Sequence, residues 1–170
     1  MRDSQRSKVY AAERVAVGQA GVSRIDSVED IKKFIDNFCC KVWFKRRFGL
    51  HFIQVKDGRG RRRAWGGNNS ITMPVWSRNK LYILHEVAHC LAVAGCYHNW
   101  EFVKVYLDLV YYVLGEDIYK ILRDQFKKHR VKYYPKKMLS EDVREKLRQN
   151  FIQNVLKKEV AYVICSNGSN

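Results

Sequence analysis

The chain has 170 residues, of which 46% are hydrophobic and 13% aromatic, so it is long and apolar enough for one globular domain and is not a disordered chain. Its 32 Lys and Arg residues outnumber 17 Asp and Glu residues, which gives a formal net charge of +15. Such an excess favours polyanionic partners, but a basic solvated surface gives the same count, so charge alone does not identify a partner.

Two helices are predicted in the first third of the chain. The Ala- and Glu-rich stretch 8–20 has apolar positions at helical spacing and predicts a short helix. Ser27, with Asp30 three residues later, is typical of a helix N-cap. The apolar face that follows predicts a second helix running to about Phe44.

Alternating apolar residues then predict strands. Residues 52–55 and 62–65 flank the turn-forming stretch 57–60, a pattern that predicts a hairpin. Residues 71–76 predict a third strand, in which Pro74 favours an edge position because proline cannot donate a hydrogen bond to a neighbouring strand. We therefore expect a small antiparallel sheet of about three strands.

A long apolar helix is expected after this sheet. Ser77 predicts its N-cap and Gly95 its C-terminal stop, and apolar residues between 78 and 94 cover most of its circumference, so it should be the central buried helix. Further helices are predicted at 99–114, at 116–129 and from Ser140. The expected fold class is α+β, in one domain over residues 1–170 with a basic helical C-terminal extension from about residue 116 and frayed termini.

His85, Glu86 and His89 form an HExxH motif on the predicted central helix. Residues four apart project from one face of a helix, so both imidazoles can reach one ion, and Glu86 lies about 100° round the helix from His85. Imidazole nitrogens hold a zinc ion well, and an adjacent carboxylate can take the proton from a water molecule. The motif predicts His85 and His89 as ligands of Zn²⁺ and Glu86 as the general base.

A third ligand is expected from the chain beyond this helix. His98 follows Gly95 by three residues, where a chain reversal would return it to the ion, and imidazole is a common zinc ligand. Glu101 and Asp108 are the alternatives. Asp108 fits better as an acceptor that orients a ligating imidazole, or as a surface carboxylate.

Simpler interpretations of the motif compete with a catalytic site. The histidines can be core residues, but burying two imidazoles and a carboxylate on an apolar helix costs several kcal/mol unless a metal compensates. A structural zinc site usually has four protein ligands. Cys90 and Cys96 lie near the motif, but three histidines already complete a catalytic ligand set.

The cysteines and the N-terminus indicate the compartment. Five cysteines, an odd number without a CxxC pair, are typical of a reducing environment. Residues 1–7 lack the apolar core of a signal peptide, and no apolar run reaches the roughly 20 residues that cross a bilayer. These features predict a cytoplasmic protein, or one in the host cytoplasm if a phage encodes it, with no membrane partner.

The motif, His98 and the apolar helix after it resemble the HExxH plus HGxxF pattern of SprT-like zinc metalloproteases and, more closely, that of small zinc metallohydrolases of phages and bacteria. The Val-Tyr-Ala-Ala-Glu stretch at 9–13 is similar to an early element of the second group. The resemblance covers residues 71–110 well. It implies a zincin-like domain with three zinc ligands, His85, His89 and His98, and with Glu86 as catalytic base.

Two features depart from known patterns. Asn99 stands where the family has glycine, a replacement that the turn tolerates because Asn accepts left-handed backbone angles. The Gly-Cys-Tyr-His stretch at 95–98 places its histidine three residues later than in metzincins. The motif helix is therefore expected to be nearly one turn longer than theirs, which disfavours a metzincin.

The leading functional hypothesis is a zinc-dependent metallohydrolase, specifically a metallopeptidase that acts on a protein or peptide substrate. Residues 71–75, as an edge strand, would pair with an extended substrate through main-chain hydrogen bonds. An oxyanion donor would come from Tyr97, Tyr106, Tyr134 or a nearby arginine.

The alternative is a basic nucleic-acid-binding protein whose metal site is not catalytic. Basic clusters lie at 45–47, 59–63 and 127–137, with Trp43, Trp65, Tyr133 and Tyr134 nearby to stack on bases. The two properties can coexist, as in SprT-like proteases that act on DNA-bound proteins. No feature of the sequence indicates whether the protein is a monomer or an oligomer.

Overall fold

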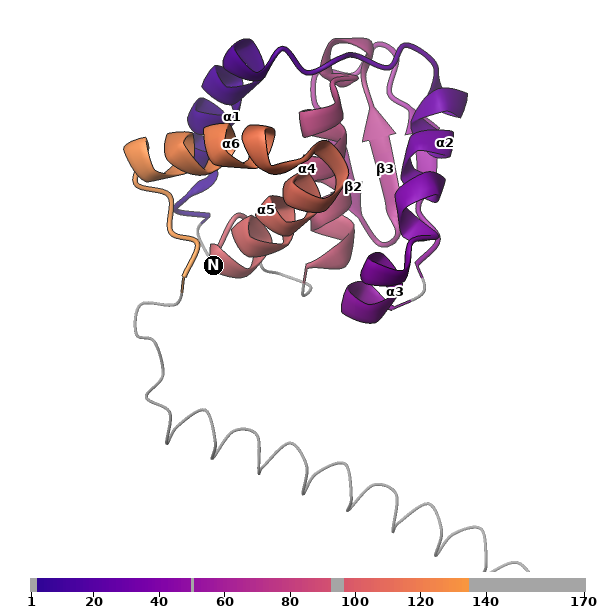
Figure 1. Cartoon of the computed structure of the whole chain (residues 1–170). Coiled ribbons are helices and arrows are strands. Elements are labelled where there is room, and N and C mark those ends of the chain that lie inside the picture. Colours follow the sequence, from indigo (N-terminus) through magenta and orange to yellow (C-terminus); the bar gives the residue numbers. More distant parts are fainter. Residues whose placement is uncertain (1–2, 50, 93–96, 135–170) are drawn as a thin grey trace, which may run out of the picture. The chain divides into compact units, whose positions relative to one another are not determined.

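The computed structural model describes residues 3–49, 51–92 and 97–134 (Figure 1). Within these residues the chain forms six α-helices and a small three-stranded sheet, which confirms the α+β class. The helix that carries the HExxH motif is α4 (Lys80–Leu91), and it packs against the sheet and against α5 (Trp100–Leu114). No helix in the described ranges is long and apolar enough to span a membrane.

The first predicted helix is confirmed as α1 (Arg6–Ala20), whereas the second divides in two. Ser27 caps α2 (Val28–Cys39) as predicted, because its Oγ accepts a 2.9 Å hydrogen bond from the Asp30 N–H. The expected continuation to Phe44 is wrong, since Lys41 is extended and α3 (Val42–Phe48) starts afresh. On one straight helix Phe38 and Phe44 would face different directions, and the break lets both pack in the core.

The sheet is mixed, and its strand pairing differs from the predicted hairpin. Strand β3 (Ser70–Met73) is central: it pairs in parallel with β1 (Gln54–Asp57) and antiparallel with β2 (Trp65–Gly67). The tight turn joins β2 to β3, where Asn68 and Asn69 both adopt left-handed angles that suit a two-residue hairpin.

The predicted edge position of residues 71–76 is therefore wrong. All four residues of β3 are buried, and the two edges of the sheet are β1 and β2. Pro74 follows the last residue of β3, so it removes no hydrogen bond from the sheet.

The central helix is buried as predicted, but its ends differ from the sequence-based bounds. Asn79 is the N-cap, since its Oδ1 accepts a 2.9 Å hydrogen bond from the Leu81 N–H, while Ser77 lies in a 3₁₀ turn and donates to Pro74 O. Ala92 is extended, so α4 ends at Leu91 and the expected longer helix is wrong. The predicted stop, Gly95, lies outside the described residues.

The remaining helices agree with the sequence. Asn99 caps α5, and Gly115 separates it from α6 (Glu116–Lys128), whose buried Leu122 and Phe126 face the rest of the fold. Helix α6 packs on both α1 and α5. The helix predicted from Ser140 lies outside the described residues.

Edge strand β2 lies directly against the motif helix. Gly66 makes this approach possible: a Cβ atom at this position would lie 2.1 Å from the carbonyl oxygen of Glu86, closer than any van der Waals contact. The sequence thus brings an edge strand of the sheet next to the backbone of Glu86 in the motif.

Candidate metal centre

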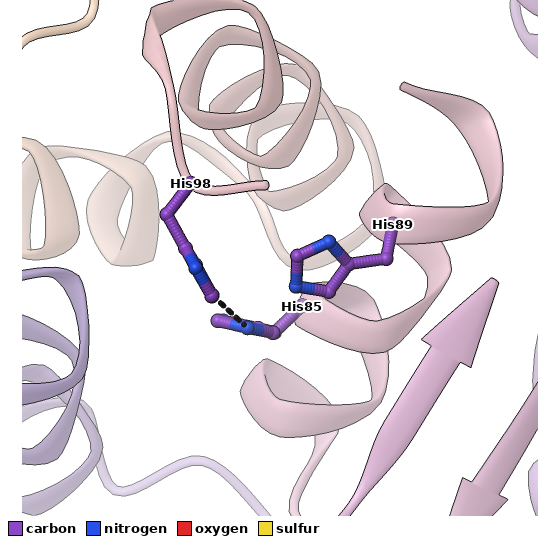
Figure 2. Close-up of side chains that lie close together, drawn as sticks. All are labelled: His85, His89 and His98. Atoms are coloured by element: carbon purple, nitrogen blue, oxygen red, sulfur yellow. Dashed lines mark hydrogen bonds between the residues drawn. The ribbon is translucent and has the colours of Figure 1, made fainter. Parts of the chain in front are cut away.

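Three imidazoles meet at the end of the fold where α4 and the start of α5 come together. His85 and His89 project from one face of α4, and His98 approaches from the residue before the cap of α5 (Figure 2). One ring nitrogen from each residue lies within 4.8 Å of the others, and the Nε2 atoms of His85 and His98 are 3.1 Å apart. The structure thus brings together the three predicted ligands.

This donor set fits a tetrahedral ion. Bonds of about 2.0–2.1 Å place ligand nitrogens roughly 3.3–3.4 Å apart, close to the 3.1 Å between His85 and His98. The longer separations, up to 4.8 Å, would close by rotation of a side chain. Three protein ligands leave one coordination position free, as in catalytic rather than structural zinc sites.

A buried carboxylate from α1 faces the far side of His85. Glu13 Oε1 lies 3.2 Å from His85 Nδ1, and both side chains are almost fully buried. The approach is not aligned as a hydrogen bond, and Nδ1 has no hydrogen-bond partner among the described residues. Glu13 is itself held by Tyr106, whose hydroxyl lies 2.6 Å from the carboxylate and 3.1 Å from the Leu81 carbonyl oxygen. These contacts leave His85 Nε2 directed toward the other imidazoles.

His98 has a carboxylate of its own. Its Nδ1 lies 2.6 Å from Asp3 Oδ2, a separation that fits a charge-assisted hydrogen bond. His89 differs, because its ring stacks on Phe102 with centroids 4.2 Å apart. No carboxylate within the described ranges forms an ion pair with His89.

Burial favours neutral imidazoles at two positions. It lowers the pKa of His89 to about 2, helped by His85 and His98. Burial also lowers the pKa of His98, against the opposing effect of Asp3. For His85 burial is the largest single effect and acts in the same direction, but the carboxylates of Glu13, Glu86 and Asp3 together outweigh it and raise the pKa. Neutral imidazole is the form that binds metals, so His89 and His98 need lose no proton near neutral pH.

Glu86 stands beside this cluster and is not part of it. Burial raises the pKa of its carboxyl group to about 7, with His85 acting in the opposite direction and Glu13 in the same direction. A carboxylate whose pKa lies near neutrality is well matched to accepting and returning a proton. Glu86 also lines the two cavities beside the cluster.

Two neighbouring cavities open beside the cluster. The larger, of about 650 Å³, contains His89 and the β2 strand in its walls, and the smaller, of about 240 Å³, contains His85 and Glu13. Both are lined by Arg6, Tyr10, Arg63, Ala64 and Glu86. Two of the predicted ligands, His85 and His89, therefore border cavities that can admit a molecule larger than water.

Several residues considered from sequence take other positions. Asp108 forms an ion pair with Arg47, which fits the surface alternative, and Glu101 lies in the first turn of α5 outside the histidine cluster. Cys90 approaches the Ser70 carbonyl oxygen at 3.4 Å, and burial raises the pKa of its thiol to about 11. Cys96 lies outside the described residues.

Of the tyrosines considered as oxyanion donors, only some line a cavity. Tyr106 is fully buried and its hydroxyl is bound to Glu13 and Leu81, so it does not face a cavity. Tyr97 lines the larger cavity, whereas Tyr134 lines neither. Tyr10 lines both cavities, with its ring centroid 5.1 Å from that of His98, although sequence analysis did not select it.

Sequence analysis also missed Asp3 and Glu13. One signal was available for Glu13: it shares a face of α1 with Val9, Ala12 and Ala16, which are all buried. A carboxylate on an apolar helix face requires a partner.

Comparisons of the chain with protein-family models, curated proteins and solved structures found no match. The functional argument therefore rests on the geometry of the site.

Proposed function

We propose that the protein is a zinc-dependent metallohydrolase that cleaves peptide bonds. The observation that carries this proposal is the cluster of His85, His89 and His98, with a ring nitrogen of each within 4.8 Å of the others, beside a cavity that Glu86 also lines. The resemblance to SprT-like metalloproteases and to small phage and bacterial metallohydrolases agrees with it. Zinc is the preferred ion because three imidazoles and an open position suit its chemistry.

Each residue has a defined task in this reaction. The three imidazoles hold the ion through one nitrogen each, and Glu13 and Asp3 contact the opposite nitrogens of His85 and His98. When bound, zinc would lower the pKa of a water molecule and polarise a substrate carbonyl. Glu86 would accept the proton of the attacking water and return it to the leaving amine.

Sequence analysis placed the substrate along residues 71–75, but residues 71–73 of this stretch lie in the central strand β3, so we propose the edge strand β2 as the substrate site instead. Strand β2 has β3 on one side only, and residues 63–68 line the larger cavity together with Glu86 and His89. An extended peptide lying along this edge would pass next to the carboxylate of Glu86. The lining of this cavity includes Tyr10, Tyr97 and three arginines, Arg6, Arg61 and Arg63, each of which is able to donate a hydrogen bond to an oxyanion.

Substitution of Glu86 by Gln tests the proposed function. The purified variant should retain near-stoichiometric zinc, because Glu86 lies outside the ligand cluster, and should lose hydrolysis of a mixed library of fluorescence-quenched peptides. The exposed Glu116→Gln variant serves as a matched control and should keep both properties. A wild-type chain without zinc, or a Glu86→Gln variant that hydrolyses the library as the wild type does, would refute the proposal.

Nucleic acid is a second candidate partner, and the rim of the larger cavity favours it. Arg6, Arg61 and Arg63 lie there beside the half-exposed aromatic rings of Trp65 and Tyr97. No ion pair joins these arginines to a carboxylate in the described part of the chain. Arginines and exposed aromatic rings together suit single-stranded nucleic acid.

Binding of a labelled single-stranded oligonucleotide at several salt concentrations tests this candidate. Affinity should fall steeply with salt, and a double Arg61→Gln, Arg63→Gln variant should lose more affinity than a Lys45→Gln, Arg46→Gln variant with the same charge change on α3. Absent or salt-insensitive binding would remove nucleic acid as a partner. If the protein bound the oligonucleotide but had no peptidase activity, the result would instead support a basic nucleic-acid-binding protein whose metal site is not catalytic.

A further inference from the structure

The position of His98 depends on contacts from a distant part of the chain. His85 and His89 are held by the regular backbone of α4, whereas His98 lies between Tyr97, which has a left-handed backbone angle, and Asn99, the N-cap of α5. The side chain of Asn99 is engaged with the N–H groups of Glu101 and Phe102. Regular secondary structure therefore does not fix the direction of the His98 imidazole.

The N-terminal segment supplies this constraint at two points. Asp3 Oδ2 lies 2.6 Å from His98 Nδ1, although the two residues are 95 positions apart in sequence. Gln5 Nε2 donates a 3.0 Å hydrogen bond to the backbone carbonyl oxygen of His98. One contact orients the ring, and the other holds the backbone that carries it.

Gln5 is well anchored for this role. Its side-chain amide donates to the carbonyl oxygen of Lys132 at 3.2 Å, and its Oε1 accepts from the N–H of the same residue. The residue is buried, so both ends of the amide are satisfied in a protected environment. Gln5 thereby joins the segment after α6 to the backbone of the third candidate ligand.

The contact with Asp3 also determines which nitrogen of His98 is available. A carboxylate at Nδ1 favours the tautomer with the proton on Nδ1, which leaves the lone pair of Nε2 free. That Nε2 atom faces the Nε2 atom of His85. The Asp3 contact therefore presents His98 to the ion in the form that binds a metal.

From these contacts we propose that Asp3 and Gln5 are positioning residues for His98, and that the third metal ligand is formed only with the N-terminal segment in place. This inference rests on the proposed metal site and names the part of the chain that completes it. Neither residue contacts the reacting atoms.

The test measures zinc affinity by competition with a chromophoric chelator. Asp3→Ala should weaken zinc binding 10- to 100-fold, the range typical for loss of a carboxylate that orients a ligating histidine. Gln5→Glu keeps the side-chain size and the acceptor for the Lys132 N–H, but places an oxygen against the His98 carbonyl oxygen, so it should also weaken binding. Asp124→Ala, on the exposed face of α6, is the matched control and should bind zinc as the wild type does.

A double-substitution comparison separates positioning from general stability. If Asp3 acts through His98, then adding Asp3→Ala to His98→Ala should cause no further loss of zinc affinity. The visible spectrum of the cobalt-substituted protein should change in the same way in both single variants, since each loses His98 as a well-placed ligand. Urea unfolding of the metal-free variants records any loss of folding stability.

The outcomes are distinct. Wild-type affinity in the Asp3→Ala variant, or an equal further loss in the His98→Ala background, would overturn the positioning role while leaving the proposed function intact. Absence of zinc binding by the wild type would overturn both proposals. A loss of affinity confined to chains that contain His98, with an altered cobalt spectrum, would support the positioning role.

Discussion

Replacing Gly66 by Ala is the most direct test of how the edge strand and the motif helix are arranged. The added Cβ atom would lie 2.1 Å from the carbonyl oxygen of Glu86 and 2.8 Å from its carbonyl carbon. Both are backbone atoms of α4, so no side-chain rotation can relieve the contact. To reach even the 3.0 Å limit that real Cβ contacts respect, β2 and α4 must separate by about 0.9 Å.

The expected loss of stability follows from this geometry. Overpacking a well-packed interior costs about 1–3 kcal/mol, and the upper end applies because two backbone segments must move. Loss of the freedom of glycine in the unfolded chain offsets roughly 0.4–1 kcal/mol. We expect Gly66→Ala to lower the free energy of unfolding by about 2 kcal/mol.

The assay is urea unfolding of the metal-free protein, with Gly18→Ala as the matched control. A Cβ atom at Gly18, inside α1, would have no neighbour within 4 Å, so this variant should gain up to about 1 kcal/mol from its better helix propensity. Hydrolysis by Gly66→Ala should also fall, because β2 lines the cavity that Glu86 also lines. If Gly66→Ala were as stable as the wild type, the close packing of β2 on α4 would be wrong.

Three further predictions concern the buried groups around the histidines. Glu13→Gln should weaken zinc binding 10- to 100-fold in chelator competition, because Glu13 faces Nδ1 of His85, whereas the exposed Glu116→Gln variant should bind zinc as the wild type does. Tyr106→Phe removes the hydroxyl that contacts Glu13 and Leu81, and should lower the free energy of unfolding by about 1–3 kcal/mol in urea titrations. The Glu86 carboxyl has a pKa raised from 4.5 to about 7 by burial, so its contribution to metal-free stability is full below pH 4.5 and is lost as pH rises through about 7. Wild type should therefore lose about 3 kcal/mol relative to Glu86→Gln between pH 4 and pH 8, and parallel pH profiles would contradict this reasoning. The lowered pKa of His89 instead removes stability as pH falls below 6.5, but it does so in both proteins and cancels in the comparison.

Local pattern was sufficient for the part of the site that lies on one helix. The spacing of His85 and His89 and the apolar surroundings of α4 determine that both imidazoles lie on one face of a buried helix. The cap at Ser27 was likewise readable, because the residues that form it are three positions apart. His98 could be proposed from its place after the helix, but its approach to the other two histidines needed the fold.

Local pattern failed where strands choose partners. A period of two predicts a strand without naming its neighbour, so residues 52–55 and 62–65 were paired across the nearest turn. In the structure Asn68 and Asn69 provide the two left-handed positions of a tight hairpin, and β1 pairs with β3 in parallel instead. The wrong pairing also placed the open edge of the sheet on the wrong strand.

The carboxylates around the site could not be predicted from the motif, since Asp3 lies 95 residues from His98 and Glu13 lies 93 residues from Tyr106. Their position has a thermodynamic consequence. If α1 and the segment before it strengthen metal binding, then a bound ion must stabilise the docking of α1 by the same free energy, because coupling between two binding events is reciprocal. Helix α1 packs mainly on α6, so a bound ion would add a second source of stability to this docking. If the proposed site binds a metal, binding and the folding of the N-terminal helix would then be parts of one equilibrium.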